Sequence, residues 1–332
     1  MKTIIHCGIF GLLCLLLTGC EQGGFDPNEP GLLVPKTVET DLSLRSVSVN
    51  GTQLHSEAYG NPADPMLVIL HGGPGADYRY LLNCTKFADQ GFYVVFYDQR
   101  GSGLSKRHPK TAYSIEIMLD DLKAVIAHYR NAPSQKVFLL GHSWGGMLAT
   151  AYINTSPTQI NGAIIAEPGG FVWQDVIDYV GRSQDFKFLS ETLNDATYAD
   201  QFLTANEDQH ALLDYKFGLM ASADGAKDSP VGNEGPLPFW RSGAMVSRAL
   251  FERGEKEAPD WTTHLSQFSP EVLFVYSQNN KAYGLGHAQR VSSAYPRVQL
   301  VKIEDAGHDM LSFAKGWSHF FPVALNYLNS LK

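Results

Sequence analysis

The sequence predicts an α/β fold, in which a mostly parallel sheet carries helices on both faces and is interrupted by an inserted helical region. Short segments that are apolar throughout alternate with helical patterns, which is typical of strands buried in a parallel sheet. Two alternating segments joined by Asn50-Gly51 precede them. Asn-Gly in that setting predicts a hairpin, and hence antiparallel strands at one edge. Between residues 168 and 270 the alternation stops, which predicts the insertion.

Each expected element follows from a local pattern. The hairpin pairs residues 42–49 with 53–59, and the later strands are expected at residues 66–70, 92–97, 136–140, 163–166, 272–276 and 298–303. Ser114 predicts the N-cap of a helix that keeps its apolar residues on one face up to Tyr129. A last helix is expected near residues 318–331. Residues 36–167 and 271–332 then form the core, and the aromatic-rich residues 168–270 form a helical cap over the carboxyl edge of the sheet.

The composition is that of a folded protein with no affinity for nucleic acid. Of 332 residues, 44% are hydrophobic and 18% are charged, which is enough to bury a large core. There are 26 Lys and Arg against 34 Asp and Glu, a net charge of −8. The sequence contains no basic run or stripe, so a nucleic-acid partner is not expected.

Residues 1–19 predict a signal peptide. Lys2 gives a positive start, and residues 4–17 are almost wholly apolar. About 14 residues are too short to span a bilayer, which takes about 20, but suit the core of a signal peptide. The sequence Leu17-Thr18-Gly19-Cys20 resembles the lipobox of bacterial lipoproteins. The resemblance implies cleavage before Cys20 and lipidation of that cysteine; a plain secretory signal that happens to contain a Cys is the alternative.

Residues 20–35 are expected to form a lipidated tether, since they are rich in Gly, Pro and acidic residues. Several acyl chains would hold the chain stably on a membrane. Glu21 rather than Asp follows Cys20, which by the same resemblance favours the bacterial outer membrane. After removal of the signal, Cys84 is the one cysteine left besides Cys20, so no intramolecular disulfide is expected. No Cys/His cluster has zinc spacing, and no metal or cofactor is expected.

A strand–turn–helix pattern surrounds Ser143. The apolar residues 137–140 are followed by Gly141-His142-Ser143-Trp144-Gly145 and then by a helical pattern over residues 147–153. A Gly-x-Ser-x-Gly turn between a buried strand and a helix is the nucleophile elbow, whose strained backbone requires small residues beside the serine. Ser143 is therefore the expected nucleophile.

A serine hydroxyl needs a base at neutral pH. Among the 11 histidines, His308 stands out because it follows the last expected strand by a few residues. That is the position of the base when the nucleophile comes first in the chain and the histidine last. His71 and His142 flank motifs and are expected to be structural supports.

An oxyanion hole needs two backbone N–H groups aimed at one point. The N–H of Trp144, directly after the nucleophile, is the first candidate. The second is expected from the loop His71-Gly72-Gly73-Pro74-Gly75, where glycine lets the backbone approach a substrate closely. Gly73 is the first choice there and Gly72 the second.

Three motifs together resemble those of proline iminopeptidases and their relatives in the α/β-hydrolase fold family. They are residues 71–75, the sequence Asp98-Gln99-Arg100-Gly101-Ser102-Gly103, and residues 141–146. The resemblance covers residues 40–167 and 270–331. It implies removal of an N-terminal residue, preferably proline, or hydrolysis of a related amide or ester, without a metal. It also implies that Asp98 and Arg100 hold a loop near the site.

The triad acid departs from the resemblance. Family members place an Asp after the strand expected at residues 272–276, where this chain has Asn280. An amide can orient an imidazole but cannot stabilise its charged form as a carboxylate does. Glu167 ends the strand after the nucleophile helix, and the acid of some other α/β hydrolases occupies that strand end. The sequence therefore favours Ser143–His308–Glu167 over Ser143–His308–Asn280.

The substrate is expected to be a small molecule or a short peptide. The Trp-Glu pair with which aminopeptidases of this family hold the substrate's ammonium group is missing from the cap region. Glu234, with the nearby Trp240, is the substitute considered for substrate binding, and Asp175 and Asp178 are further options. The leading hypothesis is an acyl-enzyme serine hydrolase, either an aminopeptidase or a carboxylesterase. A non-catalytic surface lipoprotein that uses the fold for binding is the alternative.

Overall fold

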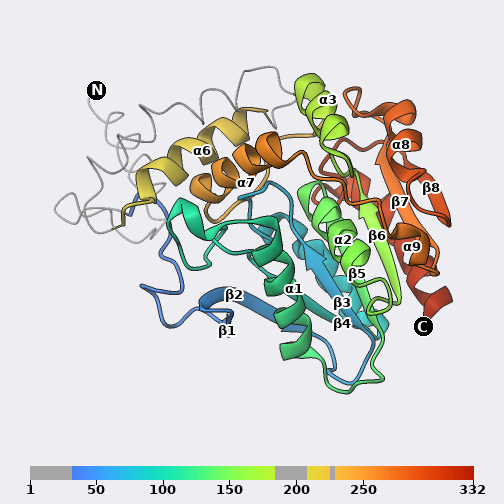
Figure 1. Cartoon of the computed structure of the whole chain (residues 1–332), viewed down its shortest axis with the longest axis horizontal. Helices are drawn as coiled ribbons and strands as arrows, with labels where there is room; N and C mark the ends of the chain where they lie inside the picture. The colour runs from blue at the N-terminus through green and yellow to red at the C-terminus, as the bar shows by residue number, and fades with distance from the viewer. Residues whose placement is uncertain (1–31, 184–207, 225–228) are drawn as a thin grey trace, which may run out of the picture. The chain divides into compact units, whose positions relative to one another are not determined.

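Eight strands form one sheet in the order β1-β2-β4-β3-β5-β6-β7-β8 (Figure 1). The computed structural model describes residues 32–183, 208–224 and 229–332, with side chains of residues 220–224 excepted. Strand β2 pairs antiparallel with β1 and with β4. The other pairs are parallel, so the predicted α/β fold with antiparallel strands at one edge is confirmed.

The elements follow the predicted alternation. In chain order they are β1 (Ser46–Val49), β2 (Thr52–Tyr59), β3 (Met66–Leu70), η1 (Arg79–Gln90), β4 (Tyr93–Tyr97), η2 (Lys110–Ala112), α1 (Ile115–Tyr129), β5 (Val137–His142), α2 (Trp144–Thr155), β6 (Gly162–Ala166), α3 (Trp173–Ser183), α6 (Ala211–Asp224), α7 (Ala244–Glu257), η3 (Leu265–Gln267), β7 (Val272–Ser277), α8 (Gly284–Ser292), β8 (Val298–Ile303) and α9 (Ala314–Leu331).

Local signals account for several of these boundaries. Asn50 and Gly51 both have positive φ, 44° and 71°, as the tight hairpin turn requires. The Ser114 hydroxyl accepts a hydrogen bond from the Ile117 N–H at 3.3 Å and caps α1. One expectation was wrong: β8 is not covered on both faces. It is the last strand of the sheet, and most of its residues are half-buried or exposed, because among the described strands it pairs on one side, with β7.

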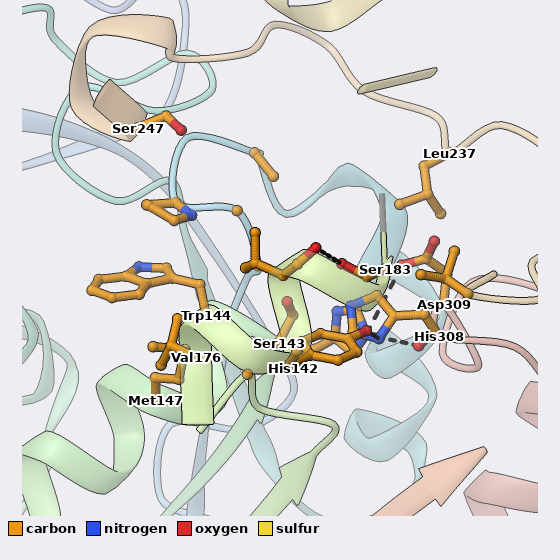
Figure 2. Close-up of a pocket in the computed structure, with 18 of the residues that line it drawn as sticks. His142, Ser143, Trp144, Met147, Val176, Ser183, Leu237, Ser247, His308 and Asp309 are labelled. Atoms are coloured by element: carbon orange, nitrogen blue, oxygen red, sulfur yellow. Dashed lines mark hydrogen bonds and ion pairs between the residues drawn. The ribbon is translucent and has the colours of Figure 1, made fainter. Parts of the chain in front are cut away.

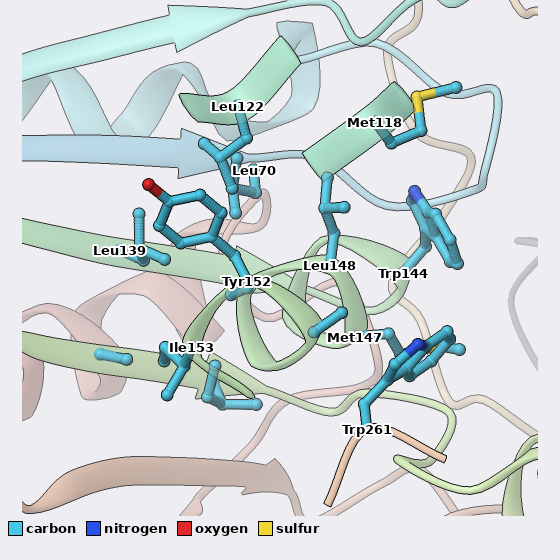
Figure 3. Close-up of a cluster of buried hydrophobic side chains, with 14 of the residues drawn as sticks. Leu70, Met118, Leu122, Leu139, Trp144, Met147, Leu148, Tyr152, Ile153 and Trp261 are labelled. Carbon is cyan, nitrogen blue, oxygen red and sulfur yellow. The ribbon is translucent and has the colours of Figure 1, made fainter. Parts of the chain in front are cut away.

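The strands send alternate side chains to two separate cores. In β3, Met66, Val68 and Leu70 belong to one cluster, whereas Leu67 and Ile69 belong to the other, as the period of two in a strand dictates. Helices α1, α2 and α8 pack on the first face, and η1 and α9 pack on the second. Figure 3 shows α2 against the first face, with its Leu148 and Tyr152 beside Leu122 of α1. This packing holds the turn between β5 and α2 in a fixed position.

Helices α3, α6 and α7 belong to the region between β6 and β7 (Figure 1). Some of their side chains line the cavity described below. Buried ion pairs join α6 to the core. Asp214 of α6 accepts hydrogen bonds from Arg107 at 3.1 Å and from Arg241 at 2.8 Å, and its side chain is fully buried. Since Arg107 belongs to the loop after β4, one carboxylate links both regions.

The predicted signal peptide, Cys20 and most of the predicted tether lie outside the described residues. Among the described residues, no helix is both long and apolar enough to cross a membrane. Cys84 is buried in η1 as a free thiol, and burial raises its pKa, as in a packing residue.

Candidate active site

Ser143 lies at a strained turn between β5 and α2. Its backbone has φ 54° and ψ −123°, a conformation that costs free energy for any residue but glycine. The Ser143 N–H donates to the carbonyl of Ala166 at 2.8 Å, which anchors the turn to the end of β6. The side chain is partly exposed and faces a cavity (Figure 2). The elbow predicted from the sequence is therefore present as a backbone geometry.

The glycines beside Ser143 are required by contacts that a side chain would break. A Cβ at Gly145 would stand 2.0 Å from the carbonyl oxygen of Leu70 in β3. A Cβ at Gly141 would stand 2.3 Å from the carbonyl oxygen of Gly145. Both distances are far inside van der Waals contact, so neither position accepts even alanine without moving the backbone.

His308 and Glu167 form a hydrogen-bonded pair. The Nδ1–H of His308 donates to Oε2 of Glu167 at 2.8 Å, and the carboxylate is fully buried. His308 lines the same cavity as Ser143. Because Nδ1 is engaged with the carboxylate, Nε2 is the ring nitrogen left to act on a hydroxyl in the cavity.

The second oxygen of Glu167 is equally well held. Oε1 accepts from both the backbone N–H and the hydroxyl of Ser277, each at 2.6 Å. Glu167 itself has φ 43°, and its N–H donates to the Val275 carbonyl at 3.1 Å. The carboxylate oxygens of Glu167 thus accept four hydrogen bonds: two from Ser277, one from His308 and one from Asn280. Together they fix the orientation of the carboxylate relative to the imidazole.

Asn280 contacts the acid and not the base. Its Nδ2 donates to Oε2 of Glu167 at 2.8 Å and to the Tyr179 hydroxyl at 3.1 Å. Its Oδ1 accepts from the Tyr283 N–H at 3.1 Å. An amide so occupied does not orient His308 directly, so the alternative Ser143–His308–Asn280 disagrees with the geometry. The Tyr179 hydroxyl, from α3, also lies 3.3 Å from His308 Nδ1, a contact that no local pattern in the sequence indicates.

The environment of His308 favours its charged form. Burial by itself lowers the pKa of this imidazole, but the hydrogen bond and the charge of Glu167 outweigh burial, and the pKa is raised above its ordinary 6.5. A carboxylate that raises the basicity of an imidazole also stabilises the imidazolium formed when a serine gives up its proton.

Gly72, the second choice for the oxyanion hole, is already occupied. Its N–H donates to the Tyr80 hydroxyl at 2.7 Å. That hydroxyl in turn lies 2.8 Å from Nδ1 of His142, whose Nε2 lies 2.8 Å from the His308 carbonyl oxygen. A neutral His142 with its proton on Nε2 satisfies every bond in this chain, and burial lowers its pKa well below 6.5. The Gly72 expectation was therefore wrong, because Tyr80 takes its donor.

The N–H groups of Gly73 and Trp144 remain available. Within the described part of the chain, neither donates to a protein acceptor. Trp144 is the first residue of α2, where an N–H has no acceptor inside the helix. Gly73 has φ 118°, and a Cβ there would stand 2.5 Å from the Gly75 nitrogen. The loop approaches the nucleophile closely, since a Cβ on Gly72 would stand 3.1 Å from the Ser143 Cβ.

Gln99 joins the two sides of this oxyanion region. Its Nε2 donates to the His71 carbonyl at 2.9 Å, and its Oε1 accepts from the Trp144 indole at 2.8 Å. Its backbone N–H donates to Nε2 of His71 at 2.9 Å. His71 therefore acts as the structural support expected from the sequence, and Gln99 is a support that the sequence did not single out.

The neighbouring residues Asp98 and Arg100 hold their loop, as the resemblance implied. Asp98 accepts from the N–H groups of Tyr78 and Leu104 and from Nδ1 of His55 at 2.8 to 3.0 Å. Arg100 makes two hydrogen bonds to Asp121 of α1, at 2.7 and 2.9 Å.

The cavity over Ser143 measures about 290 Å³ and is mainly apolar. Its walls come from the elbow, the Gly73 loop and helices α3, α6 and α7, and include Met147, Trp173, Val176, Phe239, Leu250 and Phe251. Glu234 is exposed, and neither Glu234 nor Trp240 lines the cavity. The Trp240 ring packs edge-on against Tyr78 and His55 instead. Both residues were therefore wrong as substrate-binding candidates.

Asp175 and Asp178 also point elsewhere, since Arg290 pairs with them at 2.9 and 3.7 Å. The carboxylate that does line the cavity is Asp309, directly after His308 in the chain. Its adjacency to the base was the one signal that could have found it.

Comparison with known proteins finds hydrolases among the proteins that this chain is similar to. Residues 61–216 match the family model described as serine aminopeptidase, S33. A proline iminopeptidase of Thermoplasma volcanium is 40% identical over 100 residues, which cover 30% of this chain and 33% of that protein. Epoxide hydrolase B of Mycobacterium tuberculosis is 30% identical over 123 residues, covering 36% and 34%. The chain thus spans about a third of the length of each of these relatives.

Solved structures extend the likeness to most of the fold. The crystal structure of a proline iminopeptidase from Mycobacterium smegmatis has a TM-score of 0.57 and 16% sequence identity, and the match covers 87% of this chain and 98% of that one. The chain therefore has the α/β-hydrolase fold. Together with the family model, the matches support a serine hydrolase.

Proposed function

We propose that this chain is a serine hydrolase that cleaves small amides or esters through an acyl-enzyme formed on Ser143. The observation that carries the proposal is the 2.8 Å bond between His308 Nδ1 and the buried Glu167, beside the cavity that Ser143 faces. A base oriented by a carboxylate next to a serine on a strained elbow is the arrangement that activates a hydroxyl.

In the first half of the reaction, Nε2 of His308 accepts the proton of the Ser143 hydroxyl as its oxygen bonds to the substrate carbonyl carbon. The negative charge that develops on the carbonyl oxygen meets the N–H groups of Gly73 and Trp144, and Glu167 stabilises the imidazolium. His308 then gives its proton to the departing amine or alcohol, and the acyl group stays on Ser143. In the second half, His308 takes a proton from water as the water oxygen bonds to the acyl carbon. The bond between the acyl carbon and Ser143 Oγ then breaks, His308 returns the proton to Ser143, and the carboxylic acid leaves.

Two substrate classes fit this chemistry. Release of an N-terminal residue, proline or another, from a short peptide is the first, by analogy with the aminopeptidase family model. A carboxylic ester is the second, and the mainly apolar wall of the cavity favours it. Paired substrates separate the two: an aminopeptidase hydrolyses proline β-naphthylamide faster than a short-chain acyl nitrophenyl ester, and an esterase shows the opposite order.

Labelling with a fluorophosphonate probe tests the proposal itself, since such probes phosphonylate activated serines. Wild-type protein should be labelled, and Ser143→Ala should not. Ser156→Ala is a matched control, because Ser156 ends α2 at the opposite end from the elbow. Lack of labelling in the wild type, or labelling that survives Ser143→Ala, would favour the non-catalytic binding protein instead.

We also propose that the chain is exported and anchored to a bacterial membrane through lipid on Cys20. The support is the lipobox-like sequence at residues 17–20 behind an apolar segment. In a Gram-negative host, wild-type protein should partition into the detergent phase of Triton X-114 and incorporate radiolabelled palmitate. Cys20→Ser should lose both properties, whereas Cys14→Ser, within the predicted signal, should keep them. Palmitate incorporation that persists in Cys20→Ser would contradict the proposal.

A further inference from the structure

Asp309 places a carboxyl group in the cavity beside the base. Its side chain is 4% exposed, and it lines the cavity together with Ser143 and His308 (Figure 2). A nitrogen of His142, a nitrogen of His308 and an oxygen of Asp309 all lie within 4.8 Å of one another. The hydrolytic steps above make no use of this carboxyl group, and a buried charge without a role is costly to keep.

One end of the carboxyl group is fixed. Asn233, from the segment before α7, donates from Nδ2 to Oδ2 of Asp309, and its Oδ1 accepts the Asp309 N–H at 2.8 Å. The side chain of Asn233 is itself buried and lines the same cavity. This two-point contact fixes the carboxyl plane and directs it into the cavity.

The other oxygen, Oδ1, faces the cavity without a donor from the part of the chain that the structure describes. The nearest ring nitrogen is Nε2 of His142 at 3.9 Å, and its proton is directed to the His308 carbonyl oxygen at 2.8 Å. Burial lowers the pKa of His142, with the charge of His308 acting in the same direction, so this ring supplies no counter-charge at neutral pH.

Asp309 is nevertheless ionised at neutral pH. Burial raises its pKa to about 6, and the neighbouring His308 acts against that rise. Above pH 6 most molecules therefore carry a negative charge on this carboxyl group beside the cavity. No Lys or Arg is present among the described residues that line the cavity.

The remaining walls suit a cation as well. Aromatic rings of Trp173, Phe239 and Phe251 line the cavity, and the faces of such rings attract positive charge. A bound cation would supply a counter-charge for the carboxylate of Asp309.

We propose that Asp309 is a specificity-determining residue that selects substrates carrying a positive charge next to the scissile bond. The inference rests on the proposed hydrolase function and narrows its substrate class. The charge can belong to the acyl side, as in the protonated amine of an N-terminal residue, or to the leaving group, as in a choline ester. Both place an ammonium group within a few bonds of the carbonyl carbon that Ser143 attacks.

Pairs of matched substrates test the proposal. They also show whether the positive charge is recognised on the acyl side or on the leaving group. For the acyl side, prolyl β-naphthylamide is compared with its neutral isostere, cyclopentanecarbonyl β-naphthylamide. For the leaving group, butyrylcholine is compared with 3,3-dimethylbutyl butyrate. In one of the two pairs the full-length wild type should prefer the charged member. Asp309→Asn should lower kcat/KM for that member at least about 10-fold, as expected when one charge of a buried ion pair is removed. The loss on the charged member should exceed any change on the neutral member at least about 10-fold, because the effect of the lost Asp309 charge on His308 acts on both members alike.

Asp305→Asn is the control, because Asp305 lies in the same loop but its side chain is 71% exposed. It should leave both members of each pair unchanged. An equal fall on charged and neutral members in Asp309→Asn would show that Asp309 only supports His308 and would overturn the proposal. So would a wild type that prefers the neutral members. In either case, fluorophosphonate labelling of Ser143 would still stand, so the hydrolase function would survive the failure of this inference.

Competition provides a second readout that needs no turnover. Prolinamide and choline, but not cyclopentanecarboxamide, should slow fluorophosphonate labelling of wild-type Ser143 if both sources are accepted. Whichever cation protects the wild type should lose that protection in Asp309→Asn. Equal protection of both proteins by the charged compound would overturn the proposal.

Discussion

The amide of Asn280 donates to Oε2 of Glu167 at 2.8 Å, the same oxygen that accepts from His308. Asn280 stands where the resembled family has its acid. Here it donates a hydrogen bond to Glu167, which follows the neighbouring strand β6. Strands β6 and β7 are adjacent and parallel, so their carboxyl ends lie at the same edge and side chains from either end can reach one imidazole.

This relationship predicts unequal effects of two substitutions. Glu167→Gln keeps the shape but removes the charge that stabilises the imidazolium, so kcat should fall about 10³- to 10⁴-fold. Asn280→Ala removes one of several hydrogen bonds to Glu167 and should lower kcat less than about 10-fold, in line with the net worth of one hydrogen bond. Steady-state kinetics on a neutral ester give both values. The opposite ranking would show that Asn280 is the orienting group.

The raised pKa of His308 predicts the acid limb of the pH profile. His308 must be neutral to accept the Ser143 proton, so activity falls as the pH drops through its pKa, and the midpoint should lie above the ordinary 6.5. Glu167→Gln removes the cause of the rise, and burial then dominates, so the midpoint of the residual activity should move to lower pH. A neutral substrate is needed, because Asp309 also titrates, near pH 6. Glu304→Gln, an exposed carboxylate in the same loop, should not move the midpoint.

The raised pKa of His308 affects folding stability and activity in opposite directions as the pH changes. Folded His308 binds its proton more tightly than the unfolded chain does, so its contribution to the free energy of unfolding is fully present below pH 6.5 and is lost as the pH rises through the folded-state pKa. We therefore expect the loss of activity on the acid limb to be reversible and to precede any loss of circular dichroism. Unfolding that coincides with the activity loss would contradict this assignment.

The elbow predicts a strict requirement for glycine. Gly145→Ala places a Cβ 2.0 Å from the Leu70 carbonyl oxygen and should lower the free energy of unfolding by about 2 kcal/mol or more, as overpacking does. Gly181→Ala is the matched control, since Gly181 is exposed in α3 and its Cβ would meet nothing within 4 Å. That change should be neutral or stabilise the helix by up to about 1 kcal/mol. Urea unfolding measures both. Equal stability of the two variants would mean that the turn can relax around Gly145.

The buried ion pairs that Asp214 of α6 makes with Arg107 and Arg241 are expected to contribute to the free energy of unfolding. Asp214→Asn leaves the buried guanidinium groups of Arg107 and Arg241 without this shared carboxylate, and breaking a buried pair costs about 3 kcal/mol or more. Glu257→Gln breaks the exposed pair with Arg253 and should cost less than about 0.5 kcal/mol. Thermal unfolding compares the two variants. A small effect of Asp214→Asn would indicate that Arg107 and Arg241 find other acceptors.

Local sequence signals located most of the fold. The hairpin at Asn50-Gly51, the cap at Ser114 and the strand runs depend on conformational preferences within a few residues, and each is found within a few residues of its predicted place. The elbow belongs to the same group, because its glycines and its strand–helix context are contiguous. Burial of β8 was the exception, since edge position depends on strand order and not on the strand's own residues.

The sequence by itself determined the α/β fold, through the alternation of apolar strand segments with helical patterns. It also predicted Ser143 as the nucleophile and His308 as the base, each from a short local segment. The tertiary structure decided which groups meet around them. Glu167 reaches His308 across 141 residues and Asn280 reaches Glu167 across 113. The Tyr80 hydroxyl accepts the Gly72 N–H, and Asn233 holds the carboxyl group of Asp309 beside the cavity. A hydrogen bond requires its two atoms within about 3 Å, and for residues so far apart in the chain that proximity is set by how strands and helices pack and not by the spacing of residues along it.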